Sequence, residues 1–103
     1  MKLITASFKK ALTDYPLYSQ EGKSDPVVHV KLFHPAGAGT WFVTEYDPEN
    51  KMAFGFVTGF GGDEFGYISM DEMECADLPL GIQIERDIHF KPQLLSKCLL
   101  EAS

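Results

Sequence analysis

Two carboxylates and one imidazole stand at alternate positions near the end of the chain: Glu85, Asp87 and His89. If residues 82–90 are extended, these three side chains project from one face of the strand, about 7 Å apart at each step. Carboxylate oxygens and imidazole nitrogens are ligands that divalent metals accept in proteins. One strand rarely completes such a site, so a metal or catalytic centre here requires groups from a second strand.

The same segment also has a structural interpretation, in which Glu85 and Arg86 form ion pairs and His89 donates to a backbone carbonyl. A metal site would need His29 or His34 as a further ligand. The chain has no His-x-His or Cys-x-x-Cys spacing, no Rossmann or P-loop fingerprint, no Gly-x-Ser-x-Gly elbow and no His-Glu-x-x-His pair. We therefore assign no catalytic residue, metal or cofactor, and expect an interaction protein rather than an enzyme.

Aromatic residues alternate with glycines between residues 54 and 67. Glycine lets a backbone approach a ligand closely, and aromatic rings supply stacking area, so this region could line a cleft. The residues assigned to such a ligand cleft are Trp41, Phe56, Phe60 and Tyr67. The alternative is an aromatic core on one face of a sheet, with the glycines at bulges and turns.

The charge is unevenly distributed along the 103 residues, which carry a net charge of −6. Residues 45–87 hold eleven of the fifteen acids and two of the nine bases, so this segment alone has a net charge of −9. Such a segment attracts a protein partner with a basic surface and disfavours direct binding of nucleic acid. The predicted interaction residues are Glu85, Arg86, Asp87 and His89, together with the acidic residues Asp71, Glu72 and Glu74.

Hydrophobic periodicity and turn residues predict an α+β fold. The expected elements are a helix over 5–14, strands over 28–33, 40–47, 52–58 and 66–68, a short acidic helix over 70–76 that Ser69 caps, an extended segment over 82–90, and a C-terminal helix whose first turn holds Pro92. Short connections favour an antiparallel meander of four to five strands. We expect the N- and C-terminal helices to cover one face of this sheet.

The chain length fits a single domain over residues 1–103, because a second core would not fit. No apolar run reaches the ~20 residues that span a bilayer, and the N-terminal residues are too short for a signal-peptide core. The two cysteines are expected to be reduced. These features predict a cytoplasmic protein.

Several motifs together resemble one family of small bacterial proteins, the domain of unknown function 2958. They are Val-His-Val-Lys-Leu-Phe from Val28, Trp-Phe-Val-Thr-Glu-Tyr-Asp from Trp41, Phe-Gly-Phe-Val-Thr-Gly from Phe54, Gly-Tyr-Ile-Ser from Gly66, and Leu-Gly-Ile-Gln-Ile-Glu-Arg-Asp-Ile-His-Phe from Leu80. The resemblance extends from about Leu3 to Leu95. It implies the company of plasmids, conjugative elements or phage-derived regions, and hence an accessory or counter-defence role.

Three functions follow as hypotheses. The first is a non-enzymatic interaction module of a bacterial mobile element that meets its partner through an acidic surface. The second is a nucleic-acid mimic that inhibits a host defence nuclease of the restriction or CRISPR type. The third is a metal- or small-ligand-binding enzyme that uses Glu85, Asp87 and His89.

Overall fold

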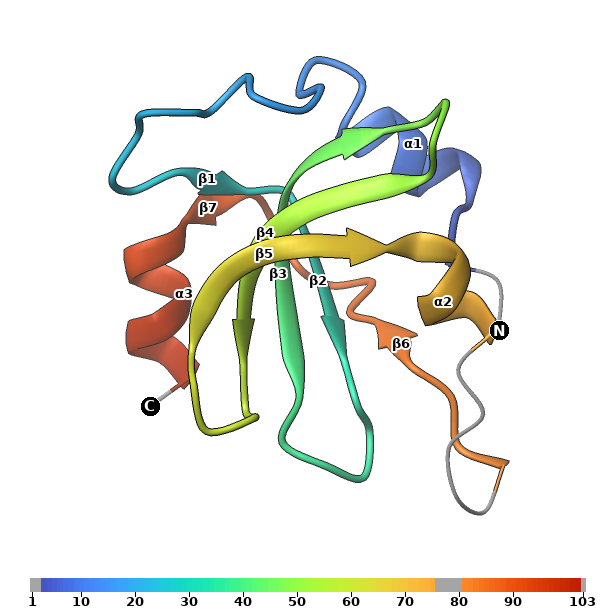
Figure 1. Cartoon of the computed structure of the whole chain (residues 1–103). Coiled ribbons are helices and arrows are strands. Elements are labelled where there is room, and N and C mark those ends of the chain that lie inside the picture. The colour runs from blue at the N-terminus through green and yellow to red at the C-terminus, as the bar shows by residue number, and fades with distance from the viewer. Residues whose placement is uncertain (1–2, 76–80, 103) are drawn as a thin grey trace.

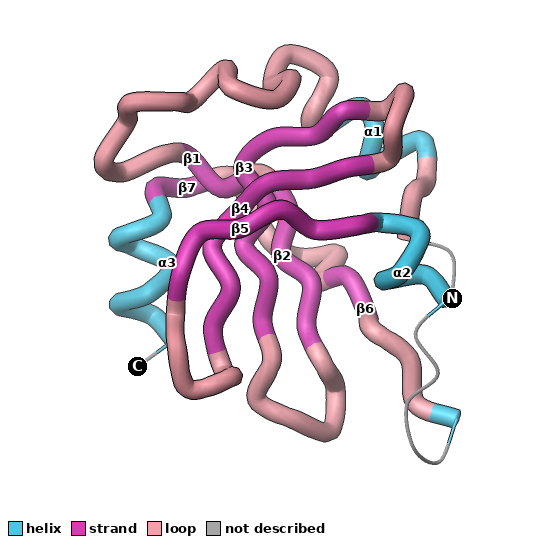
Figure 2. The backbone as a smooth tube through the Cα atoms, viewed as in Figure 1, coloured by secondary structure: helices cyan, strands magenta, loops and turns pink. Residues whose placement is uncertain are grey.

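The computed structural model describes residues 3–75 and 81–102 (Figure 1). Its elements in chain order are α1 (Ala6–Ala11), β1 (Val27–Val28), β2 (Val30–Phe33), β3 (Thr40–Asp47), β4 (Met52–Thr58), β5 (Glu64–Ser69), α2 (Met70–Cys75), β6 (Glu85–Arg86), β7 (Gln93–Leu94) and α3 (Leu95–Ala102). The predicted α+β class is confirmed. A long loop joins α1 to β1 and runs along one side of the molecule (Figure 2).

The main sheet has five antiparallel strands in the order β5-β4-β3-β2-β6. β2 to β5 form the predicted meander, and β3 and β4 have the predicted bounds. β5 is longer than the predicted strand over 66–68. The predicted strand over 28–33 is divided: Val27 and Val28 pair with β7, whereas Val30 to Phe33 pair with β3 and β6.

Caps explain where the helices begin. Thr5 Oγ1 accepts from the Phe8 N–H at 3.2 Å, and Ser69 Oγ accepts from the Glu72 N–H at 3.3 Å, as predicted for α2. The predicted end of α2 at Ala76 lies outside the described residues. Pro92 does not enter α3, which begins only at Leu95. Here Asp25 supplies the cap, because its carboxylate accepts from the Ser96 N–H at 2.8 Å.

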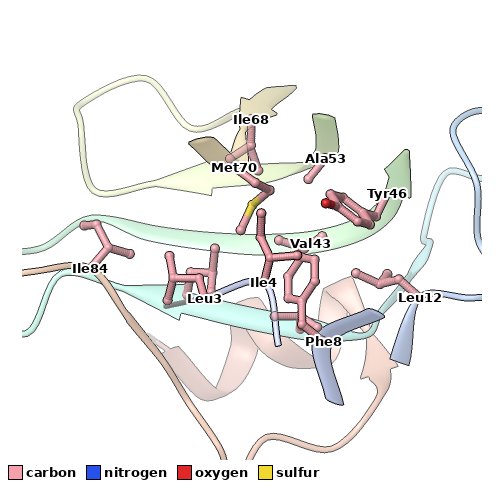
Figure 3. Packing of buried hydrophobic residues seen from close by; sticks show 12 residues of the cluster. Leu3, Ile4, Phe8, Leu12, Val43, Tyr46, Ala53, Ile68, Met70 and Ile84 are labelled. Atoms are coloured by element: carbon pink, nitrogen blue, oxygen red, sulfur yellow. The ribbon is translucent and has the colours of Figure 1, made fainter. Parts of the chain in front are cut away.

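The terminal helices pack on opposite faces of the sheet, so the prediction of one shared face is wrong. Phe8 of α1 and Leu12, which caps the end of this helix, belong to a core cluster with Val43 (Figure 3), whereas Cys98 of α3 belongs to a second cluster with Phe42. Neighbouring residues of a strand point to opposite faces. Because Phe42 and Val43 are both apolar, alternation could not show that the strand is buried on both sides.

Candidate functional site

The predicted extended segment 82–90 contains one short strand, Glu85–Arg86, and its extended course is wrong after Asp87. Arg86 pairs with Leu32, and the Asp87 N–H donates to the Lys31 carbonyl at 3.0 Å. The chain then turns, because Asp87 Oδ1 accepts from the His89 N–H at 3.0 Å and the Asp87 carbonyl accepts from the Phe90 N–H at 3.2 Å. A short Asp side chain that bonds to the backbone two residues ahead favours such a turn over a strand.

The turn removes the row of ligands that the alternation predicted. Among residues 3–75 and 81–102, no group of three or more His, Cys, Asp or Glu side chains is arranged to hold a metal ion. The two candidate additional ligands lie elsewhere: the His29 ring stacks on Tyr15 with 3.8 Å between centroids, and His34 Nδ1 accepts from the Ala36 N–H at 3.1 Å. Burial lowers the pKa of His29, which favours the neutral ring.

Glu85 to His89 instead form one side of a groove of about 680 Å³ at the sheet edge. We call it the β6 groove; its lining is completed by Leu3, Thr5, Ser7, Lys31 and Phe33. The structure therefore brings the predicted residues Glu85, Arg86, Asp87 and His89 to one surface. Ile88 stands at this surface with 79% of its side chain exposed.

The acids of the predicted interaction surface do not share one environment. Glu74 Oε2 accepts from the Leu3 and Ile4 N–H groups at 2.7 and 2.9 Å, so it fastens the N-terminal segment to α2. Asp71 pairs with Lys51 at 3.5 Å, and Glu72 is exposed. Glu45, also in the acidic segment, is buried. Glu45 and Glu74 therefore serve as acceptors for backbone N–H groups of the fold itself.

The four aromatic residues assigned to a ligand cleft do not line one cavity. Trp41 packs against the cluster around Val43 and contacts Phe60 at 5.6 Å between ring centroids. Phe56 packs against the cluster of α3, on the other face of the sheet. Tyr67 lines a pocket built from aromatic side chains, and Trp41, Phe56 and Phe60 are not among the lining residues of that pocket. The prediction of one cleft is wrong because Trp41 of β3 and Phe56 of β4 point to opposite faces of the sheet.

That pocket was not predicted from the sequence. It has a volume of about 300 Å³ and lies between β5 and the loop after α1. We call it the tyrosine cup; its lining is Tyr18, residues 20–23, Pro26, Thr44, Glu45, Phe54, Phe65 and Tyr67. The Phe54 ring stacks on Phe65 at 5.9 Å and meets Tyr67 edge-to-face at 5.2 Å.

A buried carboxylate holds the loop side of the cup. Glu45 Oε1 accepts from the Tyr18 N–H and Oε2 accepts from the Gln20 N–H, both at 2.8 Å. The Gln20 side chain in turn donates to the carbonyls of Val27 and Thr44 and accepts from the Val27 N–H. These contacts fasten a loop that composition alone describes as an irregular connection.

Tyr18 adopts a backbone conformation that is unusual for a large side chain. Its φ is +74°, in the region that favours glycine. Such strain costs about 1–3 kcal/mol and persists where surrounding contacts impose it. Here it directs the Tyr18 hydroxyl to that of Tyr67 at 3.4 Å, while both side chains stay exposed, at 62% and 58%.

Negative charges near the cup act on its aromatic wall. The pKa of Tyr67 is raised by its hydrogen bond with Tyr18, by partial desolvation, and by the charges of Tyr18, Glu21 and Glu45. No Lys, Arg or His nitrogen in the described part of the chain lies within 4.0 Å of the Glu45 carboxylate. The sequence signal for this site would have been Glu45 at a core position of β3, since a buried acid requires partners.

The fold and these two sites define a small α+β protein with an antiparallel five-stranded sheet and a surface pocket at each edge strand. Residues 3–102 match the family described as "Protein of unknown function (DUF2958)", and the chain belongs to this family. The resemblance noted in the sequence is thus confirmed. No curated protein and no solved structure matches the chain. None of the helices in the described residues has the length and apolar character needed to cross a membrane.

Proposed function

We propose that this protein is a non-enzymatic binding module that recognises a basic segment of a protein partner, and that the tyrosine cup receives a Lys or Arg side chain of that segment. The observation that carries this proposal is the Glu45 carboxylate: Glu45 lines an aromatic pocket, and its carboxylate has no cationic partner among the described residues. A cation is attracted both by the faces of aromatic rings and by a nearby negative charge.

The shape of the cup supports a single elongated side chain as its occupant. Tyr18 and Tyr67 form an exposed rim, and Phe54 and Phe65 provide apolar contact for an alkyl stem. Lys23 also lines the cup. In the described residues the one ammonium found over an aromatic ring is that of Lys31, above Phe42, so the rings of the cup are available to a partner.

The predicted acidic residues Glu72 and Glu85 would act at a distance in this proposal. They raise the local concentration of a basic partner by long-range attraction, while the cup supplies the contact. Nucleic-acid mimicry stays a prediction with less support, because Glu45 and Glu74 are committed to backbone N–H groups rather than to an exposed row. The bacterial, mobile-element and cytoplasmic setting likewise stays a prediction.

A peptide titration followed by NMR tests this proposal. The probe is a short Gly- and Ser-rich peptide with one central Arg, and the control peptide has Gln at that position. We expect the Arg peptide to shift the ring signals of Phe54, Phe65 and Tyr67 in a saturable way. Equal shifts with the Gln peptide, or no shift at these rings, would contradict the proposal.

A matched pair of substitutions separates binding in the cup from non-specific binding to exposed aromatic residues. Tyr67→Leu keeps an apolar side chain but removes the ring, and should weaken the Arg peptide about two- to fivefold. Phe60→Leu is the control, because Phe60 is a similarly exposed aromatic residue, at 65%, that contacts Trp41 rather than the cup. An equal loss in both variants would count against the cup as the binding site.

A further inference from the structure

Arg86 is the one arginine of the chain, and it forms no ion pair with the described residues. Its Nη1 donates to Ser7 Oγ at 3.1 Å. Its Nε is buried and has no hydrogen-bond partner among the described residues. No carboxylate of those residues lies within 4.0 Å of the guanidinium, so the ion pair considered for Glu85 and Arg86 is not formed.

Burial lowers the pKa of Arg86, because desolvation disfavours the charged form. A guanidinium has five N–H donors in a planar fork that matches two oxygens of a carboxylate or phosphate. A partly desolvated guanidinium with one satisfied donor is therefore a preformed half of a bidentate pair. The pairing of Arg86 with Leu32 in the sheet fixes where the side chain begins.

Further donors share the β6 groove with Arg86. Thr5 and Ser7 line it, and so does Lys31, whose ammonium however lies over the Phe42 ring. The oxygens of both hydroxyls already accept, from the Phe8 N–H and from Arg86, and neither hydroxyl is found donating to another described residue. Two carboxylates also line the groove, and that of Asp87 already accepts from the His89 N–H.

We propose that the β6 groove binds an oxyanion, a carboxylate or a phosphate group, with Arg86 as the principal binding residue and Ser7 as a secondary one. The two acids of the groove, Glu85 and Asp87, outweigh Arg86 in formal charge. Binding therefore depends on the desolvated fork of Arg86 rather than on a positive surface. This site is independent of the tyrosine cup, which binds the opposite charge at the other edge of the sheet.

The single arginine makes the test direct, because the Arg86 Nε–H group gives the one arginine side-chain signal of its type in a nitrogen-correlated NMR spectrum. Inorganic phosphate and acetate are the two probes, titrated separately at constant ionic strength. We expect a saturable shift of this signal. Saturation with phosphate alone assigns the site to a phosphate group, and saturation with acetate assigns it to a carboxylate.

Three variants complete the experiment, with a backbone spectrum as the check of folding. Arg86→Lys should weaken binding at least about tenfold, because lysine cannot form the bidentate pair. Glu85→Gln should tighten it about twofold by removing a nearby like charge. Lys97→Gln removes the charge of an exposed residue of α3 and should leave the affinity for the anion unchanged. An unsaturable shift, or an equal effect of Lys97→Gln and Arg86→Lys, would overturn the proposal. If the Arg86→Lys variant is unfolded, the proposal is tested by comparing the anion affinities of the Glu85→Gln and Lys97→Gln variants.

Discussion

The tyrosine cup and the β6 groove lie beside the two edge strands of one sheet, β5 and β6, and they handle charge in opposite ways. The cup is lined by aromatic rings and by Glu45, whose carboxylate is buried. The groove holds a partly buried guanidinium beside hydroxyl groups. In both places the charge has no counter-ion among the described residues. The net charge of −6 therefore says little about which group a given surface would bind.

The two regions differ in what the charged group does for the fold. Glu45 accepts two backbone N–H groups, so it builds the loop that forms its own pocket. Arg86 makes one hydrogen bond to an exposed serine, so the fold depends on it far less. Removing the Glu45 carboxylate should therefore disrupt both the structure of the cup and its ligand binding. Removing the Arg86 guanidinium should abolish ligand binding in the groove while the fold stays intact.

The largest expected effect is that of Glu45→Gln. The amide offers one acceptor oxygen, and its NH₂ group faces a backbone N–H that then has no partner. Leaving a buried donor unsatisfied costs about 1–3 kcal/mol, so urea unfolding should show a loss of about 2 kcal/mol. Hydrogen exchange of the Tyr18 and Gln20 amides should accelerate, while exchange in β6 stays unchanged.

Glu72→Gln is the matched control for that change, because Glu72 is exposed in α2. It should alter the free energy of unfolding by less than about 0.5 kcal/mol. If Glu45→Gln were as mild as Glu72→Gln, the buried carboxylate would not be the element that builds the cup.

The second effect is smaller and has the opposite sign. Arg86→Met removes a partly desolvated charge and keeps the apolar stem, so the free energy of unfolding should rise by about 0.5–1 kcal/mol. Phosphate or acetate, whichever binds, should then stabilise the wild type but not the variant, because a ligand that binds the native state raises its stability. Thermal unfolding with and without the anion measures both. A less stable Arg86→Met protein would show that the guanidinium is structural.

The sequence predicted the parts of this comparison that depend on local patterns. Hydrophobic periodicity and turn residues predicted β3 and β4, and the Ser69 cap predicted α2. The grouping of Glu85 to His89 on one surface was also predictable, although the turn at Asp87 was not. The cup was missed because it depends on contacts between Glu45 and a loop 25 and 27 residues earlier in the chain.

The third effect is a pH dependence of the free energy of unfolding, which should act on the side of the molecule that carries the cup. Burial lowers the pKa of His29 in the native state, so the unfolded chain binds more protons. The stability that the neutral His29 ring contributes is fully present above its pKa in the unfolded chain, about 6.5. It is lost as the pH falls through the lower pKa of His29 in the native state. His29 stacks on Tyr15, which precedes the loop of the cup. Acidification should therefore speed amide exchange in this loop first, and His29→Gln should flatten the dependence.

The smallest effect concerns the two exposed hydroxyls at the rim of the cup. The Tyr18–Tyr67 contact of 3.4 Å is long for a hydrogen bond between hydroxyl groups, so Tyr18→Phe should change the free energy of unfolding by less than about 0.5 kcal/mol. It should nevertheless lower the pKa of Tyr67, because that hydrogen bond is the first cause of its upward shift. An NMR pH titration of the Tyr67 ring signals measures this change.

The same titration connects the rim to the proposed ligand. A cation bound in the cup favours the phenolate form, so the Arg peptide should lower the pKa of Tyr67 and the Gln peptide should leave it unchanged. Oxyanions that fill the β6 groove should have no effect on it, because that groove lies at the opposite edge of the sheet. A shift of the Tyr67 pKa with phosphate but not with the Arg peptide would reverse the assignment of charge to the two sites.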